Sequence, residues 1–428
     1  MNPVSDSGIS VTVDQNEYLA DGADVVDAVL TVETGADYVA AGPPPQRLEI
    51  LIIDCSGSMG NAGKFEGARH ATLAAIDALP DGTRFAIVAG TSMGRLVFPA
   101  EVPSVVADAS SRAAARRALA KLKPDGGTAM GTWLGLARQL AAKHEDTMVH
   151  AILLTDGKNE HESPEALAEE IAKSEGAFTC DCRGVGTDWR VGELRTIAAA
   201  LHGTADIVAD PAHLAADFAA MTHDSLAKAI PELTLRVWTP AGAAVRFVKQ
   251  VAPTIEDLTG RRAETGPQVG EYPLGAWGAE DRDYHLQVRL EPAAPGREKL
   301  AARISVIADG EVVGQGLVRA VWTTETELSA RISARVAHYT GQAELAEAVQ
   351  SGLAARKRGD VETATAKLRR AVQLAAESGN ESTAKLLRGV VEVDERDGTV
   401  RLRSSVAAAD EMALDVRSTK TARVRKEA

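Results

Sequence analysis

The sequence feature that most constrains the fold is the segment LEILIID at residues 48–54, which is almost wholly apolar and ends in an aspartate. A strand with one face in water alternates apolar and polar side chains, whereas this segment offers apolar side chains to both faces. A second strand of this kind, MVHAILLTDG at 148–157, also contains an aspartate near its end. Two such strands indicate a parallel sheet that helices cover on both sides.

Strand and helix patterns alternate from residue 46 to residue 228. Apolar residues between 65 and 79 recur at helical spacing, and a Pro-Asp-Gly turn ends that helix. Further strands are predicted in three segments, with helical patterns between them: 84–90, 178–186 and 205–209. Repeated strand–helix units of this type predict a doubly wound, mainly parallel α/β sheet.

The segments on either side of this region alternate apolar and polar residues with a period of two, which is typical of half-buried strands. We therefore expect the first 45 residues and residues 229–324 to form one antiparallel β-sandwich, into which the α/β domain is inserted; two separate β elements are the alternative. The expected domains are 1–45 (sandwich strands), 46–228 (α/β), 229–324 (rest of the sandwich), 325–395 (helical region) and 396–428 (a short hairpin and a mobile basic tail).

Composition excludes several classes of function. The 428 residues include 47 basic and 60 acidic side chains, and a net charge of −13 disfavours binding to nucleic acid or to anionic membranes. The first ten residues lack the basic and apolar regions of a secretory signal, and no segment approaches the roughly 18 apolar residues of a membrane span. Three cysteines suit a reducing compartment. We expect a cytoplasmic protein without membrane insertion.

Oxygen-bearing side chains follow the two central strands. Asp54, Ser56 and Ser58 come after the first strand, and Asp156 comes after the second. Thr128 follows two glycines in a loop that opens a helix. Because the carboxyl ends of parallel strands meet at one edge, these five side chains should converge there. Oxygen ligands without nitrogen or sulfur indicate a hard cation, Mg²⁺ first.

These five positions, in this order and strand context, resemble the metal-ion-dependent adhesion site of von Willebrand factor type A domains. The likeness covers about residues 46–228. The resemblance implies a six-stranded, mainly parallel sheet, with Mg²⁺ or Mn²⁺ contacted by Ser56, Ser58 and Thr128. It further implies that Asp54 and Asp156 mostly hold the water molecules of the cation. The sandwich around the domain resembles the layout of bacterial multidomain members.

The resemblance also implies a function: a cation-dependent module that binds a partner protein through an Asp or Glu of that partner. Two carboxylates only offset the charge of the ion, so the cation can still attract an external carboxylate. The surrounding contact surface is expected at the rim of the site, formed by Gly60, Gly127, Gly157, Asp188 and Trp189.

Other functions agree less well with the residues. A haloacid-dehalogenase phosphatase needs an aspartate where Ser56 stands, and a P-loop fails because Phe65 follows Gly63-Lys64. No nucleophile–base pair is evident, so we expect a protein that is not an enzyme. A phosphoryl-transfer hydrolase and a scaffold with a vestigial metal site remain the alternatives. The cysteines are interpreted as core residues, and the histidines at 144, 150 and 161 as structural or solvated.

Overall fold

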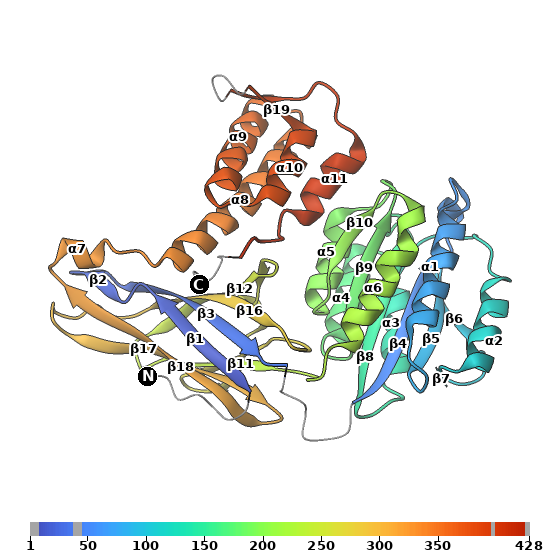
Figure 1. The fold of residues 1–428 in the computed structure, drawn as a ribbon, viewed down its shortest axis with the longest axis horizontal. Coiled ribbons are helices and arrows are strands. Elements are labelled where there is room, and N and C mark those ends of the chain that lie inside the picture. The colour runs from blue at the N-terminus through green and yellow to red at the C-terminus, as the bar shows by residue number, and fades with distance from the viewer. Residues whose placement is uncertain (1–7, 37–44, 395–398, 424–428) are drawn as a thin grey trace. The chain divides into compact units, whose positions relative to one another are not determined.

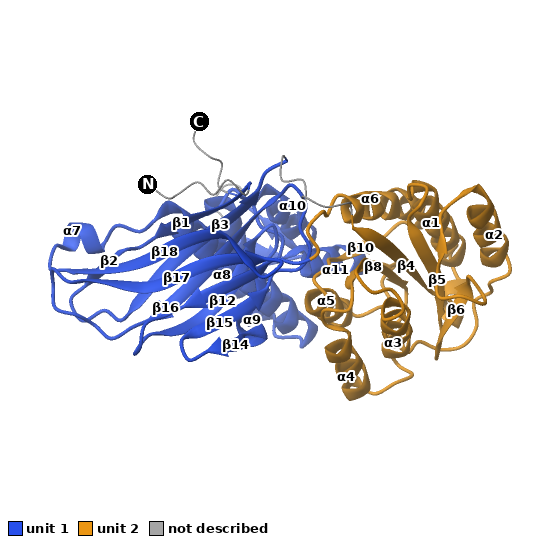
Figure 2. Ribbon diagram, turned by 90° about the horizontal axis from the view of Figure 1, so that it is seen from below, with its two compact units in different colours: residues 1–39, 232–428 blue, residues 40–231 orange. Residues whose placement is uncertain are grey.

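The computed structural model describes residues 8–36, 45–394 and 399–423. The chain divides into two compact units, shown in Figures 1 and 2. One unit, 40–231, is called here the α/β unit; the other, 1–39 with 232–428, is called the sandwich unit.

A mainly parallel sheet forms the centre of the α/β unit, as the sequence predicts. Six strands follow the order β10-β9-β8-β4-β5-β6, and a seventh strand, β7, pairs with β5. The central strand β4 runs parallel to both β5 and β8, whereas β6 and β7 run antiparallel to β5. These two short antiparallel strands were not predicted individually. The strands are β4 (Gln46–Asp54), β5 (Arg84–Gly90), β6 (Gly94–Phe98), β7 (Val105–Val106), β8 (Thr147–Thr155), β9 (Thr179–Val185) and β10 (Ala205–Val208).

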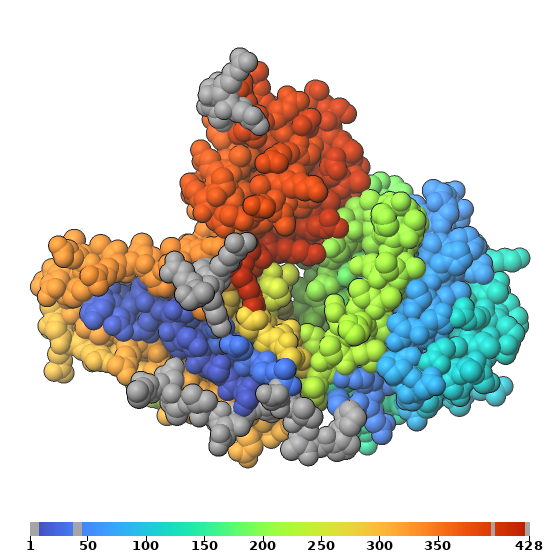
Figure 3. Space-filling model, viewed as in Figure 1, coloured from blue at the N-terminus to red at the C-terminus, as the bar shows by residue number. Residues whose placement is uncertain are grey.

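Helices cover both faces of this sheet. Helices α1, α2 and α6 lie on one face, and α3, α4 and α5 lie on the other (Figure 2). On the first face, α1 and α6 lie side by side (Figure 3). Their Ala68, Leu214 and Phe218 are buried in one cluster with Leu51 and Ile53 of β4. The helices are η1 (Gly57–Gly60), α1 (Lys64–Ala78), α2 (Ala109–Leu119), α3 (Met130–Ala141), α4 (Pro164–Ser174), α5 (Val191–Ala200), η2 (Pro211–His213) and α6 (Leu214–Leu226).

The sandwich unit joins strands from both ends of the inserted α/β unit, as predicted. One sheet has the order β1-β3-β16-β12-β13, and the other has the order β14-β15-β11-β17-β18-β2. The pairing is antiparallel except between β2 and β18, which run parallel. The elements are β1 (Ile9–Gln15), β2 (Tyr18–Ala20), β3 (Val25–Thr34), β11 (Thr234–Trp238), β12 (Ala244–Ala252), β13 (Glu256–Asp257), η3 (Thr259–Arg261), β14 (Ala263–Gly266), β15 (Val269–Pro273), β16 (Asp281–Arg289), β17 (Glu298–Ala308) and β18 (Glu311–Thr323).

The C-terminal helical region packs on the sandwich through a buried aspartate. Asp283 of β16 is fully buried, accepts a hydrogen bond from the Thr31 hydroxyl at 2.6 Å, and also accepts one from the Tyr339 hydroxyl. Arg335 lies 3.2 Å from the same carboxylate. The region contains α7 (Thr326–Ser329), α8 (Ala334–Lys357), α9 (Val361–Glu377), α10 (Glu381–Val390), β19 (Val391–Val393), β20 (Val400–Leu402) and α11 (Ala408–Arg417).

The sequence predicts only a short hairpin and, from Arg417 onward, a mobile tail, and the structure contradicts this over residues 408–423. This segment contains α11, which buries Leu414 and Val416, and the following Ser418 is also buried. Lys420 then forms a β-bridge with Thr254. The apolar side chains are too few to give a visible helical period, but they are enough to hold the segment on its unit. Residues 424–428 lie outside the described part of the chain.

Within the described residues, no helix combines the length and the apolar character that crossing a bilayer requires.

Candidate metal centre

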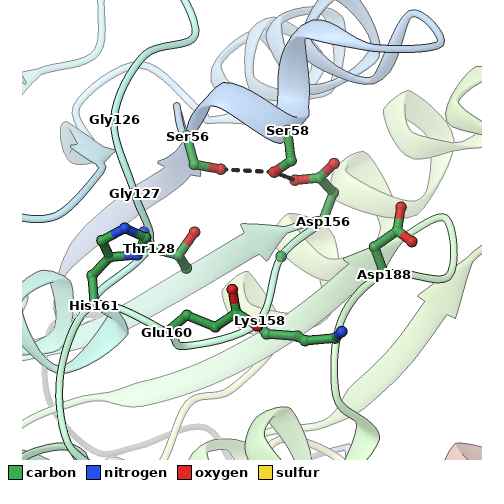
Figure 4. A pocket seen from close by; sticks show the side chains of 11 residues that line it. Ser56, Ser58, Gly126, Gly127, Thr128, Asp156, Lys158, Glu160, His161 and Asp188 are labelled. Atoms are coloured by element: carbon green, nitrogen blue, oxygen red, sulfur yellow. Dashed lines mark hydrogen bonds between the residues drawn. The ribbon is translucent and has the colours of Figure 1, made fainter.

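The five predicted ligands meet at the carboxyl edge of the parallel sheet, beside a cavity of about 310 Å³. Ser56, Ser58, Thr128 and Asp156 line the cavity, and Asp54 lies fully buried beneath them. Figure 4 shows these lining side chains, which come from the turn after β4, the loop before α3 and the end of β8.

Asp54 is fixed by hydrogen bonds from two directions. The backbone N–H of Ser56 donates to its Oδ1 at 2.7 Å, and the hydroxyl of Thr155 donates to its Oδ2 at 2.5 Å. Burial raises the pKa of Asp54 to about 6, although both hydrogen bonds act in the opposite direction. A carboxylate held in this way is costly to ionise without a nearby cation, which is the behaviour expected of a metal-site carboxylate.

The hydroxyls and carboxylates form one continuous cluster. Ser58 Oγ donates to Asp156 Oδ1 at 2.6 Å, and Ser56 Oγ lies 3.0 Å from Ser58 Oγ (Figure 4). A Cβ atom at Gly157 would lie 3.1 Å from Thr128 Oγ1, 3.6 Å from Ser58 Oγ and 3.8 Å from Asp54 Oδ2. Three oxygens, two from the end of β4 and the turn after it and one from the loop before α3, therefore surround one small space that only glycine leaves open.

The loop after β8 fixes the position of Thr128. The N–H of Thr128 donates to His161 Nδ1 at 3.0 Å, and the N–H of His161 donates to the Thr128 carbonyl at 3.0 Å. Asn159 accepts from the N–H of Met130 at 2.7 Å, and Glu162 accepts from the N–H of the next residue at 2.6 Å. The free N–H groups at the start of α3 are thus satisfied by side chains of this loop. Thr128 is therefore held in place by the same segment that carries Asp156.

A lysine that was not predicted lies beside the cluster. Lys64 Nζ donates to Asp156 Oδ2 at 2.7 Å and to Asp188 Oδ2 at 3.2 Å. Burial acts to lower the pKa of Lys64, but the hydrogen bonds and charges of the two aspartates outweigh it and raise the pKa above its ordinary value. Lys64 is therefore charged at neutral pH.

The structure places three of the five predicted rim residues in the lining of the cavity. Gly127, Gly157 and Asp188 line the cavity, whereas Gly60 packs toward Pro124 outside it. The prediction for Trp189 is wrong. Its side chain is only 3% exposed, its Nε1 donates to the Gly186 carbonyl at 3.0 Å, and its ring covers Gly184 so closely that a Cβ there would clash.

Thr155, whose hydroxyl donates to Asp54, is also not among the predicted site residues. Thr155 directly precedes Asp156, so its position in the strand-end motif was a usable signal. The structural role predicted for His161 agrees with its hydrogen bonds to Thr128, but no local pattern links the two residues, which lie 33 positions apart.

The cysteines have no role in the cluster. The Cys55 thiol points back toward the Ile53 carbonyl at 3.5 Å, and burial, with the charge of Asp54, raises its pKa to about 12. Cys180 and Cys182 are free and buried in the sheet, with their sulfurs 4.0 Å apart. They are core residues, as expected.

The donor set fits a hard divalent cation. No group of three or more His, Cys, Asp or Glu side chains suited to a metal occurs in the described part of the chain. The cluster instead combines hydroxyl oxygens with two carboxylates, which are ligands that Mg²⁺ and Mn²⁺ accept together with water.

Comparisons with known proteins agree with this architecture. Residues 49–207 match the family profile of the von Willebrand factor type A domain, and residues 373–418 match that of the von Willebrand factor type A C-terminal domain. The chain is similar to a solved von Willebrand factor type A protein from Catenulispora acidiphila, with 48% identity over 99% of each chain and a TM-score of 0.93.

Two more distant similarities extend this result. The ArnB paralog VWA2 from Sulfolobus acidocaldarius is 12% identical over 96% of this chain and 98% of that chain, with a TM-score of 0.60, which shows a shared fold. An uncharacterized protein from Synechocystis sp. is 29% identical over 273 residues. That match spans 62% of this chain and 62% of the relative.

Proposed function

Because this chain belongs to the von Willebrand factor type A family, we propose that it is a divalent-cation-dependent module that binds a partner protein through an acidic side chain of that partner. The observation that carries the proposal is the common space in front of Gly157, around which oxygens of Asp54, Ser58 and Thr128 lie within 3.8 Å of one point. Ser56 and Asp156 join this set through Ser58.

In this proposal the cation is Mg²⁺ or Mn²⁺, and Asp54, Ser56, Ser58, Thr128 and Asp156 hold it directly or through water. When bound, the cation supplies a Lewis-acidic position that accepts an oxygen from outside the protein. Three of the five side chains are neutral hydroxyls, so the charge of the ion is not exceeded by its ligands. An external carboxylate is therefore attracted to the cavity.

The surface around the cavity suits contact with a protein. Met93, at the tip of the hairpin between β5 and β6, is 70% exposed. The hairpin lies against the Thr128 loop, because the Gly127 N–H donates to Ser92 Oγ at 3.1 Å. An exposed apolar side chain near a polar cavity matches the combination of apolar and polar contacts that protein interfaces use.

The chemistry of the cavity supports binding rather than catalysis. His161, the histidine in its lining, already uses Nδ1 to accept the Thr128 N–H and contacts no serine hydroxyl through that atom. The free cysteines suit a reducing setting, so we place the protein in the cytoplasm.

The proposal is tested by titration calorimetry with Mg²⁺ and Mn²⁺ on wild type and Asp54→Asn. The variant keeps the shape of the side chain but removes one of the two carboxylates, so we expect its metal affinity to fall at least about tenfold. Asp146→Asn is the matched control, because Asp146 is exposed and precedes β8 at the opposite edge of the sheet. Equal affinities in wild type and Asp54→Asn, or no metal binding in wild type, would contradict the proposal.

A further inference from the structure

Lys64 is an unusual residue for its position. It is the first residue of α1, where the positive end of the helix dipole disfavours cations and favours Asp or Glu. Its side chain is nevertheless only 11% exposed. A buried ammonium at a helix N-terminus is retained only if a strong local partner compensates it, and here that partner is Asp156.

Lys64 contacts the cluster of predicted ligands on the side that faces away from the cavity. It does not line the cavity, whereas Asp156 does. Asp156 uses Oδ1 to accept from Ser58 and Oδ2 to accept from Lys64, so the carboxylate lies between the hydroxyl cluster and the ammonium. No hydrogen bond is found from Lys64 to the other four predicted ligands in the described residues. Lys64 thus does not occupy the position of the cation. It contacts one predicted ligand, Asp156, from the side opposite the hydroxyl cluster.

The packing around Lys64 keeps the ammonium in place. Gly186 has a left-handed backbone, with φ of 68°, and a Cβ there would lie 3.2 Å from Lys64 Cε. Asp188 follows in the same loop and contacts Nζ at 3.2 Å, although its own side chain is 72% exposed. The ammonium is therefore held between the end of β8 and the loop after β9. Its positive charge stays close to the predicted metal site.

We propose that Lys64 is a built-in counter-ion that weakens the binding of the cation alone and strengthens the binding of an external carboxylate to the loaded site. The inference rests on the proposed function of the same site. A positive charge beside Asp156 repels a divalent cation and neutralises one of its two carboxylates. The same charge attracts the incoming carboxylate, so the lysine acts on the two binding steps in opposite directions.

The test is calorimetry on wild type, Lys64→Gln and Lys64→Met, first with Mn²⁺ and then with acetate added to the Mn²⁺-loaded protein. Both variants remove the charge, and glutamine keeps a hydrogen-bond donor for Asp156. We expect Mn²⁺ to bind at least about tenfold more tightly in both variants, and acetate to bind several-fold more weakly. Lys173→Met is the control, because Lys173 forms an exposed ion pair with Glu169 on α4.

Tighter Mn²⁺ binding together with weaker acetate binding separates this role from a purely structural one. Loss of a purely structural residue would weaken the binding of both Mn²⁺ and acetate, or of neither. Should both variants unfold without metal, melting in a Mn²⁺ series replaces the titration, and a larger Mn²⁺-dependent rise in Tm than in wild type is expected. Unchanged Mn²⁺ affinity, or an equal rise in Tm, overturns the role of Lys64 and leaves the proposed function intact. Failure of all three proteins to bind Mn²⁺ overturns the proposed function itself. Binding by the variants alone supports the repulsion by Lys64 and refutes metal-dependent function in wild type.

Discussion

Gly157→Ala places a methyl group in the space that the predicted ligands share. Its Cβ would lie 3.1 Å from Thr128 Oγ1 and 3.6 Å from Ser58 Oγ. Mg²⁺ requires oxygens at about 2.0–2.1 Å in near-octahedral geometry, so a carbon atom in that space displaces the ion or one of its waters. We expect metal affinity to fall at least about 100-fold, which corresponds to about 2.8 kcal/mol.

The same substitution should leave the metal-free fold almost unchanged. The nearest contact is with a side-chain hydroxyl, which is short by only a few tenths of an ångström, and Gly157 does not have the left-handed backbone that resists alanine. Reduced entropy of the unfolded chain offsets part of the cost. A change within about 1 kcal/mol shifts the Tm of a unit of this size by about 2–4 °C.

Titration calorimetry with Mg²⁺ and differential scanning calorimetry in chelator measure the two quantities. Gly192→Ala is the matched control, because a Cβ at this position in the first turn of α5 meets nothing within 4 Å. Wild-type metal affinity in Gly157→Ala would refute the location of the site. A large loss of stability in chelator would refute the claim that the space is reserved for a ligand.

Three further predictions concern the rest of the molecule. Burial acts to lower the pKa of His150, but Glu49 and Asp181 outweigh it and raise the pKa from 6.5 to about 10. The cluster of these three residues therefore stabilises the fold fully below pH 6.5, and this contribution is lost as the pH rises through 10. His150→Gln should therefore lower Tm more at pH 6 than at pH 10, and equal losses at both would contradict the reasoning. Tyr339→Phe removes a hydrogen-bond donor to the buried Asp283 and should lower the free energy of unfolding by about 1–3 kcal/mol. Hydrogen exchange followed by mass spectrometry should then show faster exchange of the α8 amides. Unchanged exchange would argue against this contact as the anchor of α8. The excised segment 46–228 should melt cooperatively in calorimetry, since its sheet pairs only with itself; the absence of a transition would show that it depends on the sandwich unit.

The parts of the fold that the sequence predicts are those with local patterns. The near-continuous apolar segment at β4 predicts a strand covered on both faces. The period of two in β3 and β16 predicts that both belong to one antiparallel sandwich, in which the structure pairs them directly. The parallel contact of β2 with β18 and the packing of α11 depend on a few residues without a period. They could not be predicted in the same way.

The candidate site shows the same division. Asp54 is the last residue of β4 and Asp156 directly follows β8, so their meeting at one edge follows from topology alone. Lys64 reaches Asp156 across 92 residues, and its signal was a cation in the first turn of a helix, where the dipole disfavours it. The position of Trp189 after a strand end predicts a place at the rim of the site. Its burial depends on the missing side chain of Gly184, which no local pattern reveals.

The central claim is that a bound cation keeps a position open for a carboxylate from outside the protein. The most direct measurement is the paramagnetic relaxation of carboxyl-labelled ¹³C-acetate by Mn²⁺ bound to the wild-type protein, compared with Thr128→Ala. We expect a strong enhancement that saturates with acetate, vanishes in chelator and is weaker in the variant. The control is the same sample after an excess of Mg²⁺ has displaced Mn²⁺ from the protein. If Mn²⁺ binds but the acetate carbon relaxes no faster than in this control, the site is closed to external carboxylates and the proposed function is wrong.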